Sequence, residues 1–178
     1  MESTAAKKAG VLYYGIWQDA LDFTKYSGAD FANNLASNGT AIGATLPGVI
    51  NIDDCKGHYA ITNPFSSPTH SSFHLTAILH VNYCGGLGVT SMVKWMQDFS
   101  KTYKDKTGRY PVIATQPQWW NSCTNKNTEF GRINPWWNLS DKFTHRGDAT
   151  SPAGWANYTF NGGEPGTVFN GDEASLKR

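Results

Sequence analysis

The chain has 178 residues, enough to bury the core of one domain, and its formal net charge is +1 with charges of both signs scattered. This balance gives no electrostatic basis for binding nucleic acid or an anionic membrane surface. Aromatic residues make up 13% of the chain and include seven tryptophans. This content excludes a disordered protein and permits carbohydrate binding, because a sugar ring packs on an exposed indole.

The first ten residues, MESTAAKKAG, lack the apolar segment of a signal peptide. They predict either a cytosolic protein or a chain whose leader has been removed. No apolar run approaches the roughly 18 residues of a membrane span, so no span is expected. The three cysteines, Cys55, Cys84 and Cys123, allow at most one internal disulfide and leave one thiol over.

Segments with the patterns of strands and helices alternate along the chain. Strands are expected where β-branched and aromatic residues gather, at residues 10–17, 48–53, 73–83, 109–116 and 155–160. Helical patterns occupy residues 2–9, residues 19–39 with a break near Ser27-Gly28 and a stop at Asn38-Gly39, and residues 90–107. Residues 55–74 are expected to form a long loop, and residues 119–138 short helical turns and loops. This alternation predicts an α/β architecture with parallel strands.

The clearest helix lies at residues 90–107. Its N-terminus is expected to be capped by Thr90 or Ser91, and Gly108 is expected to end it. Apolar side chains recur at helical spacing along one side, from Met92 to Tyr103. Such a stripe predicts burial in the core.

The stretch TLPGVINIDDC carries two polar side chains at the end of a buried strand. Asn51 and Asp53 are two residues apart, so a strand places both on the same face. Two carboxylates in this arrangement would suggest glycosidase chemistry, but one of the two is an amide. The pattern therefore fits an active site, a disabled one, or an ordinary strand end whose side chains bond nearby backbone.

Four histidines lie between the two halves of the chain, at positions 58, 70, 74 and 80. His70 and His74 would suit a metal only if their segment were helical, and the surrounding Ser and Pro residues favour a loop. No metal or other cofactor is therefore expected. A histidine that acts as acid or base in a reshaped pocket is an alternative, because its pKa lies near neutrality.

From Thr90 onward the sequence resembles a known family. The stretch SMVKWMQDFSKTYKDKTGRYPVIATQPQWWNSCTNKNTEFGRINPWW, with PAGWANYTF and VFNGDEASLKR after it, is similar to the fungal, Chalaropsis-type lysozymes of glycoside hydrolase family 25. Upstream, SGADFANNLASNGTAIGATLPGV resembles the segment that leads to the family's LPG. The resemblance implies a shortened, irregular TIM-like (β/α) barrel in a single domain over residues 1–178. It also implies that the family's N-terminal strand–helix–strand is missing and that residues 56–83 are an insertion.

The resemblance places Asn51 and Asp53 at the positions of the family's two catalytic carboxylates. A rival register places His80 and Asn82 there. The first register is favoured because LPGV precedes Asn51. Neither register keeps both carboxylates, although hydrolysis needs a proton donor at the leaving oxygen and a group that stabilises the developing positive charge.

Two further sets of positions follow from the resemblance. It implies a disulfide between Cys84 and Cys123, which would leave Cys55 free. It also implies that the glycan cleft or its rim is lined by Trp119, Trp120, Trp136, Trp137, Trp155 and Tyr14.

The sequence thus predicts a degenerate lysozyme-like protein that has lost most or all muramidase activity and keeps a cleft for a cell-wall glycan or an unrelated small molecule. One alternative is a weakly active N-acetylmuramidase with Asp53 as the acid. Another is a scaffold repurposed as a different enzyme with a His-containing pocket. The resemblance implies secretion, and a homodimer would cover the sheet edges that the missing strands leave exposed.

Overall fold

The computed structural model describes residues 15–20, 22–52, 84–139, 151–163 and 166–169. The helical pattern at residues 2–9, most of the strand expected at residues 10–17 and the segment 56–83 lie outside the described residues. The described part contains one sheet and the helices that pack against it.

Six strands form the sheet, and their order in the sheet follows their order in the chain. They are β1 (Trp17–Asp19), β2 (Val49–Asn51), β3 (Val112–Thr115), β4 (Trp136–Asn138), β5 (Phe160–Gly163) and β6 (Gly166–Phe169). The pairs from β1 to β5 are parallel, and β6 pairs antiparallel with β5. Among the described residues β1 and β6 do not pair with each other, so the sheet is open. The predicted α/β architecture with parallel strands is confirmed.

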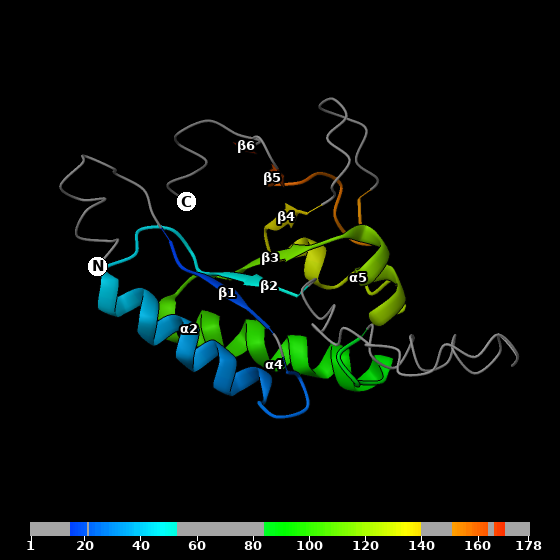
Figure 1. The fold of residues 1–178 in the computed structure, drawn as a ribbon, viewed down its shortest axis with the longest axis horizontal. Coiled ribbons are helices and arrows are strands. Elements are labelled where there is room, and N and C mark those ends of the chain that lie inside the picture. Colours follow the sequence, from blue (N-terminus) through cyan, green and yellow to red (C-terminus); the bar gives the residue numbers. More distant parts are fainter. Residues whose placement is uncertain (1–14, 21, 53–83, 140–150, 164–165, 170–178) are drawn as a thin grey trace, which may run out of the picture.

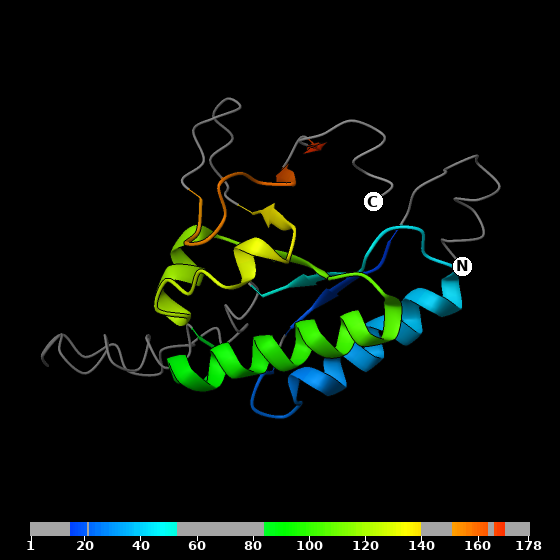
Figure 2. The same ribbon diagram turned by 180° about the vertical axis from the view of Figure 1, so that it is seen from behind.

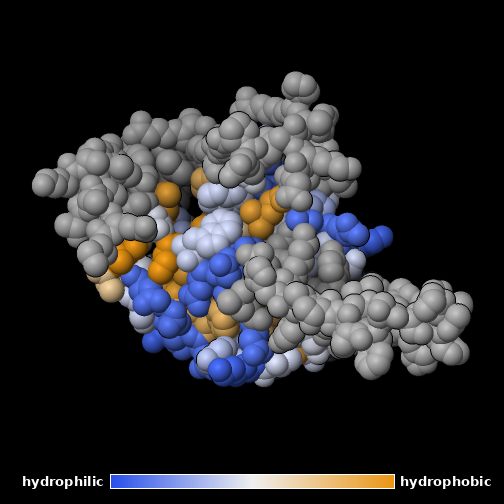
Figure 3. Space-filling model, viewed as in Figure 1, coloured by the Kyte–Doolittle hydropathy of each residue, from blue (hydrophilic) through white to orange (hydrophobic). Residues whose placement is uncertain are grey.

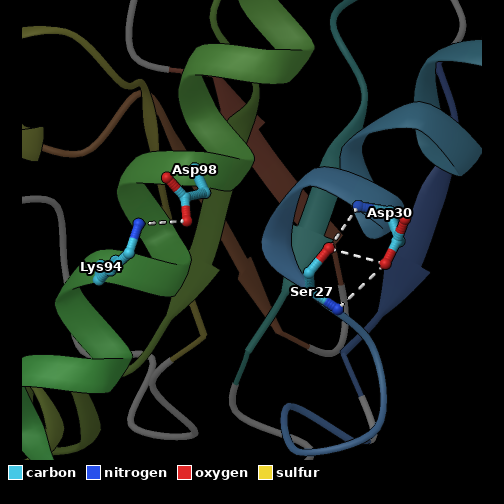
Figure 4. A network of polar contacts seen from close by, with 4 residues as sticks. All are labelled: Ser27, Asp30, Lys94 and Asp98. Atoms are coloured by element: carbon cyan, nitrogen blue, oxygen red, sulfur yellow. Dashed lines mark hydrogen bonds and ion pairs between the residues drawn. The ribbon is translucent and has the colours of Figure 1, made fainter.

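Two long helices, α2 (Gly28–Ile42) and α4 (Val89–Thr107), lie side by side against one face of the sheet (Figures 1 and 2). Helix α2 begins at the predicted break because Ser27 and Asp30 form a capping box, in which the Ser27 hydroxyl accepts a bond of 3.1 Å from the Asp30 amide (Figure 4). The predicted stop at Asn38-Gly39 was wrong. The helix continues to Ile42 and ends where Gly43 adopts a φ of 66°.

Helix α4 confirms the predicted apolar stripe but not the predicted cap. Met92, Trp95, Phe99 and Tyr103 are buried along the side that faces the core. The N-cap is Gly88, which makes no side-chain hydrogen bond, so neither Thr90 nor Ser91 caps the helix. An exposed ion pair of 2.9 Å joins Lys94 to Asp98 on the opposite side (Figure 4).

The segment after β3 is more regular than its sequence suggested. It contains α5 (Pro117–Cys123) and a 3-10 turn (Phe130–Arg132), as expected, but it also contains β4, which was predicted as loop. The strand expected at residues 155–160 was largely misplaced, because β5 begins only at Phe160. The predicted disulfide between Cys84 and Cys123 is present and joins the turn before α4 to the end of α5.

The sheet has a core on each face. The larger core lies between the sheet and the helices and includes Ile50, Ile113 and Trp136. The smaller core lies on the opposite face, where Val49, Val112 and Ala114 pack with Trp137, Leu139 and Phe160. This second face carries the candidate site.

Candidate functional site

The carboxyl ends of β1 and β2 hold a polar pair. In the parallel register Asp19 lies opposite Asn51, and Asn51 lies opposite Ala114, so all three side chains share one face. The Asn51 side-chain amide donates a hydrogen bond of 2.9 Å to Asp19 Oδ1. In α/β barrels, active sites are built at this end of the strands.

Asp19 is held from two sides. The indole Nε1 of Trp17 donates a second hydrogen bond, of 2.8 Å, to the same Oδ1 atom. Asp19 is half-buried, whereas Asn51 is only 6% exposed. The carboxylate is thereby fixed above the end of the sheet by a neighbour on its own strand and by a buried amide on the next strand.

Sequence reasoning missed Asp19 because it assigned this residue to the start of a helical region. The sequence offers little signal for this strand, because β1 has three residues and two of them, Gln18 and Asp19, are polar. Among the residues that end the first four strands, which are Asp19, Asn51, Thr115 and Asn138, Asp19 is the one carboxylate. The Asn138 amide donates a bond of 2.9 Å to Asn161 Oδ1, so this edge of the sheet is rich in amides.

A row of aromatic rings adjoins the polar pair on the same face. The centroids of Trp17 and Trp137 are 5.3 Å apart at 86°, and those of Trp137 and Phe160 are 4.9 Å apart at 27°. Trp17 lies on β1 and Trp137 on β4, with two strands between them. The face must therefore be concave, and the small Ala114 leaves room beneath Trp137. Figure 3 shows apolar and near-neutral side chains gathered over the strands, with hydrophilic side chains over α2 at the lower left.

Four of the five tryptophans predicted to line the cleft lie in the core instead. Trp119, Trp120, Trp136 and Trp155 are at most 7% exposed. Three of them satisfy the indole N–H inside the protein: Trp120 donates to Asn127, Trp136 to Thr115 and Trp155 to Asn134, each to a backbone carbonyl. A sugar ring cannot pack on these indoles, so their predicted role is corrected to core packing. Trp137 is half-buried and belongs to the aromatic row.

Several predicted positions lie outside the described residues. These are Tyr14, Asp53, Cys55, His80 and Asn82, so the choice between the two registers of the catalytic strand stays a prediction. Within the described residues, no cluster of three or more His, Cys, Asp or Glu side chains could hold a metal ion. In that same part of the chain, no helix combines the length and apolar character that crossing a membrane requires.

Two hollows lie away from the polar pair. One, of about 440 Å³, lies on the helix side of β1 and is lined by Gln18, Tyr26, Asp30, Phe31 and Asn34. Within the described residues the Gln18 Oε1 atom is buried there without a hydrogen-bond partner. The other, of about 270 Å³, lies where α2 and α4 end, beside Tyr103 and Arg109. Neither hollow includes Asp19 or Asn51.

No family model matches the chain, but individual proteins do. An N,O-diacetylmuramidase of Arthroderma benhamiae is 32% identical over 143 residues, which cover 76% of this chain and 50% of the relative. Lysozyme M1 of Streptomyces globisporus is 31% identical over 182 residues, covering 91% of this chain and 52% of that protein. The chain thus spans about half the length of these curated relatives.

Solved structures match over nearly the whole chain. A muramidase from Acremonium alcalophilum superposes with a TM-score of 0.72 at 30% identity, covering 99% of this chain and 76% of that one. A family GH25 lysozyme from Aspergillus fumigatus gives a TM-score of 0.71 at 27% identity, with the same coverage.

Proposed function

Because the chain belongs to the family of GH25 lysozymes, or muramidases, we propose that it binds a cell-wall glycan at the carboxyl edge of its sheet and hydrolyses that glycan weakly or not at all. The observation that supports weak or absent hydrolysis is that residue 51 is an asparagine. The residue at the end of β2 is an amide, and its N–H is engaged with Asp19.

An amide at this position changes the chemistry of the site. Glycoside hydrolysis requires a carboxylic acid that protonates the leaving oxygen and, in most families, a second carboxylate for the opposite side of the sugar ring. Asn51 neither donates a proton at neutral pH nor carries negative charge. Binding makes a smaller demand, because ground-state contacts do not require a group that is active only in the transition state.

The aromatic row supports the binding half of the proposal. Trp17 is 42% exposed, and it is continuous with Trp137 and Phe160 beside the polar pair. A concave surface of aromatic rings with a few fixed polar groups is the usual composition of a small-ligand site.

The test separates binding from hydrolysis on the same material. Purified protein is incubated with insoluble peptidoglycan at several pH values, and both co-sedimentation and the loss of turbidity are measured. We expect co-sedimentation with turbidity loss near background. Robust clearing that Asp53→Asn abolishes would establish a weak or full N-acetylmuramidase with Asp53 as the acid. Clearing that survives Asp53→Asn but fails in His80→Ala would favour the rival register, in which His80 and Asn82 stand at the catalytic positions.

Location and assembly are part of the same proposal. Secretion is supported by the disulfide between Cys84 and Cys123, since such bonds persist in oxidising compartments. A homodimer would cover the edge of β1, the first strand of the sheet in the described residues. Light scattering at several protein concentrations measures the assembly, and a monomer at all of them would contradict the dimer.

A further inference from the structure

We propose that Trp17 and Asp19 on β1 form a binding site for one pyranose ring of an N-acetylated amino-sugar chain. In this site the indole of Trp17 is the platform for the ring, and the carboxylate of Asp19 accepts hydrogen bonds from its hydroxyl or amide groups. The inference rests on the proposed function, because it names the residues through which this chain holds its glycan.

The platform is exposed and yet rigid. Trp17 keeps 42% of its surface in contact with solvent, which is unusual for so large an apolar side chain. Its ring is nevertheless fixed by the perpendicular ring of Trp137 and by the hydrogen bond from its own Nε1 to Asp19. A ligand that packs on a ring already held in place loses less of its binding free energy to ordering that side chain.

The acceptor is also prepared for a ligand. A carboxylate offers about four acceptor positions, and the two protein hydrogen bonds to Asp19 both reach Oδ1. Among the described residues, Oδ2 accepts no hydrogen bond, and no Lys or Arg side chain forms an ion pair with Asp19. The half-buried group therefore has acceptor capacity left for donors that come from outside the protein.

The charge of the site selects the class of ligand. An anion would be repelled by the Asp19 carboxylate, which forms no ion pair within the described residues. A divalent cation requires several oxygen ligands, and the described residues offer no cluster of three or more acidic, His or Cys side chains. Neutral groups that donate hydrogen bonds, arranged around a ring with an apolar face, fit both the carboxylate and the indole. Sugar hydroxyl and acetamido groups have this chemistry.

Asn51 acts as the positioning residue of the pair. It is buried, and its amide fixes Asp19 Oδ1 from the neighbouring strand, which turns the carboxylate so that its second oxygen is left for the ligand. The residue that is chemically unsuited to proton transfer thus has a structural reason to be an amide.

Calorimetric titration of the full chain with a hexamer of N-acetylglucosamine and with soluble peptidoglycan fragments tests the inference. Asp19→Asn removes the charge but keeps the shape, and we expect about 10-fold weaker binding from the loss of a charge-assisted hydrogen bond. Trp17→Ala should weaken binding by at least about 10-fold, whereas Trp17→Phe keeps a ring and should recover most of that loss.

Matched controls come from the same chain. Tyr26→Ala removes another exposed ring, and Asp105→Asn another exposed carboxylate, and neither should change affinity. Thermal melting of every variant checks folding. If Trp17→Ala is unfolded, the affinity of Asp19→Asn decides the outcome. The inference is overturned if the parent chain binds clearly and neither Asp19→Asn nor Trp17→Ala changes the affinity. That result would leave the proposed function standing. A parent chain that binds neither glycan overturns both.

Discussion

At the scale of single residues, the pair of Asp19 and Asn51 shows what the sequence could and could not predict. Asn51 was identified as the polar end of a buried strand, and the structure confirms this. Its partner was missed because the two residues are 32 positions apart and meet only through the register of β1 with β2. Alternation along one strand says which face a side chain takes but not which strand lies beside it.

Replacing the amide of Asn51 by a carboxylate tests how closely the pair is coupled. In Asn51→Asp, two carboxylates would face each other at the 2.9 Å now spanned by a hydrogen bond, which raises the pKa of one of them in the folded state. We expect the free energy of unfolding at pH 7 to fall by roughly 1–3 kcal/mol. Because the raised pKa favours the protonated folded form, this penalty is full above that pKa and disappears as the pH falls through it.

Urea unfolding at pH 7 and at pH 4 measures this pH dependence. The exposed Asn33 on α2 provides the control, since Asn33→Asp should change stability little and similarly at both pH values. A loss in Asn51→Asp that is equally large at both pH values would mean that steric disturbance, not charge repulsion, is responsible.

At the scale of elements, the helices were predicted better than the short strands. The apolar spacing of α4 located that helix to within a residue, because nineteen residues carry several turns of the pattern. Strand β4 has three residues, too few for alternation to be recognised, and two of them are tryptophans that fit a helix equally well. The cap of α4 was misplaced because Gly88 follows a turn tied down by the disulfide at Cys84, so chain geometry decided where the helix begins.

The contact between α2 and α4 depends on the first residue of α2. A Cβ atom added at Gly28 would lie 2.1 Å from the carbonyl oxygen of Trp95 and 2.9 Å from the amide nitrogen of Phe99. Both are backbone atoms, so neither can rotate away. The sequence indicated a break at this glycine, but only the packed helices show that it permits the two backbones to approach.

We therefore expect Gly28→Ala to lower the free energy of unfolding by roughly 3 kcal/mol or more, as overpacking does where backbone must shift. Chemical unfolding followed by circular dichroism measures it. Gly88→Ala is the matched control, because the added Cβ would meet no atom within 4 Å. That change should cost at most about 1 kcal/mol, the range for an altered N-cap. Equal losses in the two variants would show that the contact at Gly28 relaxes without strain.

At the scale of the whole molecule, the family resemblance predicted the architecture, whereas local patterns could not. The alternation of strands and helices indicated parallel pairing but not the order of the strands or the concavity of the face that carries Trp17 and Trp137. The predicted cleft-lining role of Trp120 and Trp136 was wrong as well. Trp120 lies on α5 and Trp136 on β4, and both rings are buried in the core on the helix side of the sheet. Only the packed structure shows which side chains of these two short elements take that side.

The disulfide between Cys84 and Cys123 contributes to stability on this same scale. It joins residues 39 positions apart, and it connects the segment that precedes α4 with the end of α5. Closing a loop of this length restricts the unfolded chain, which stabilises the folded protein by about 4 kcal/mol in the chain-entropy account. The double variant Cys84→Ala/Cys123→Ala should therefore lose up to this amount of unfolding free energy in urea, and the parent chain under reducing conditions should lose a similar amount.

Mass mapping of the unreduced protein should find Cys55 as the one alkylated cysteine. Cys84 and Cys123 pack in the core on the helix side of the sheet, whereas Trp17 and Asp19 lie on the opposite face. Glycan affinity should therefore be unchanged wherever the variant is folded. A folded variant that binds the glycan more weakly than the parent chain would contradict this expectation. It would show that the disulfide also fixes the geometry of the glycan site.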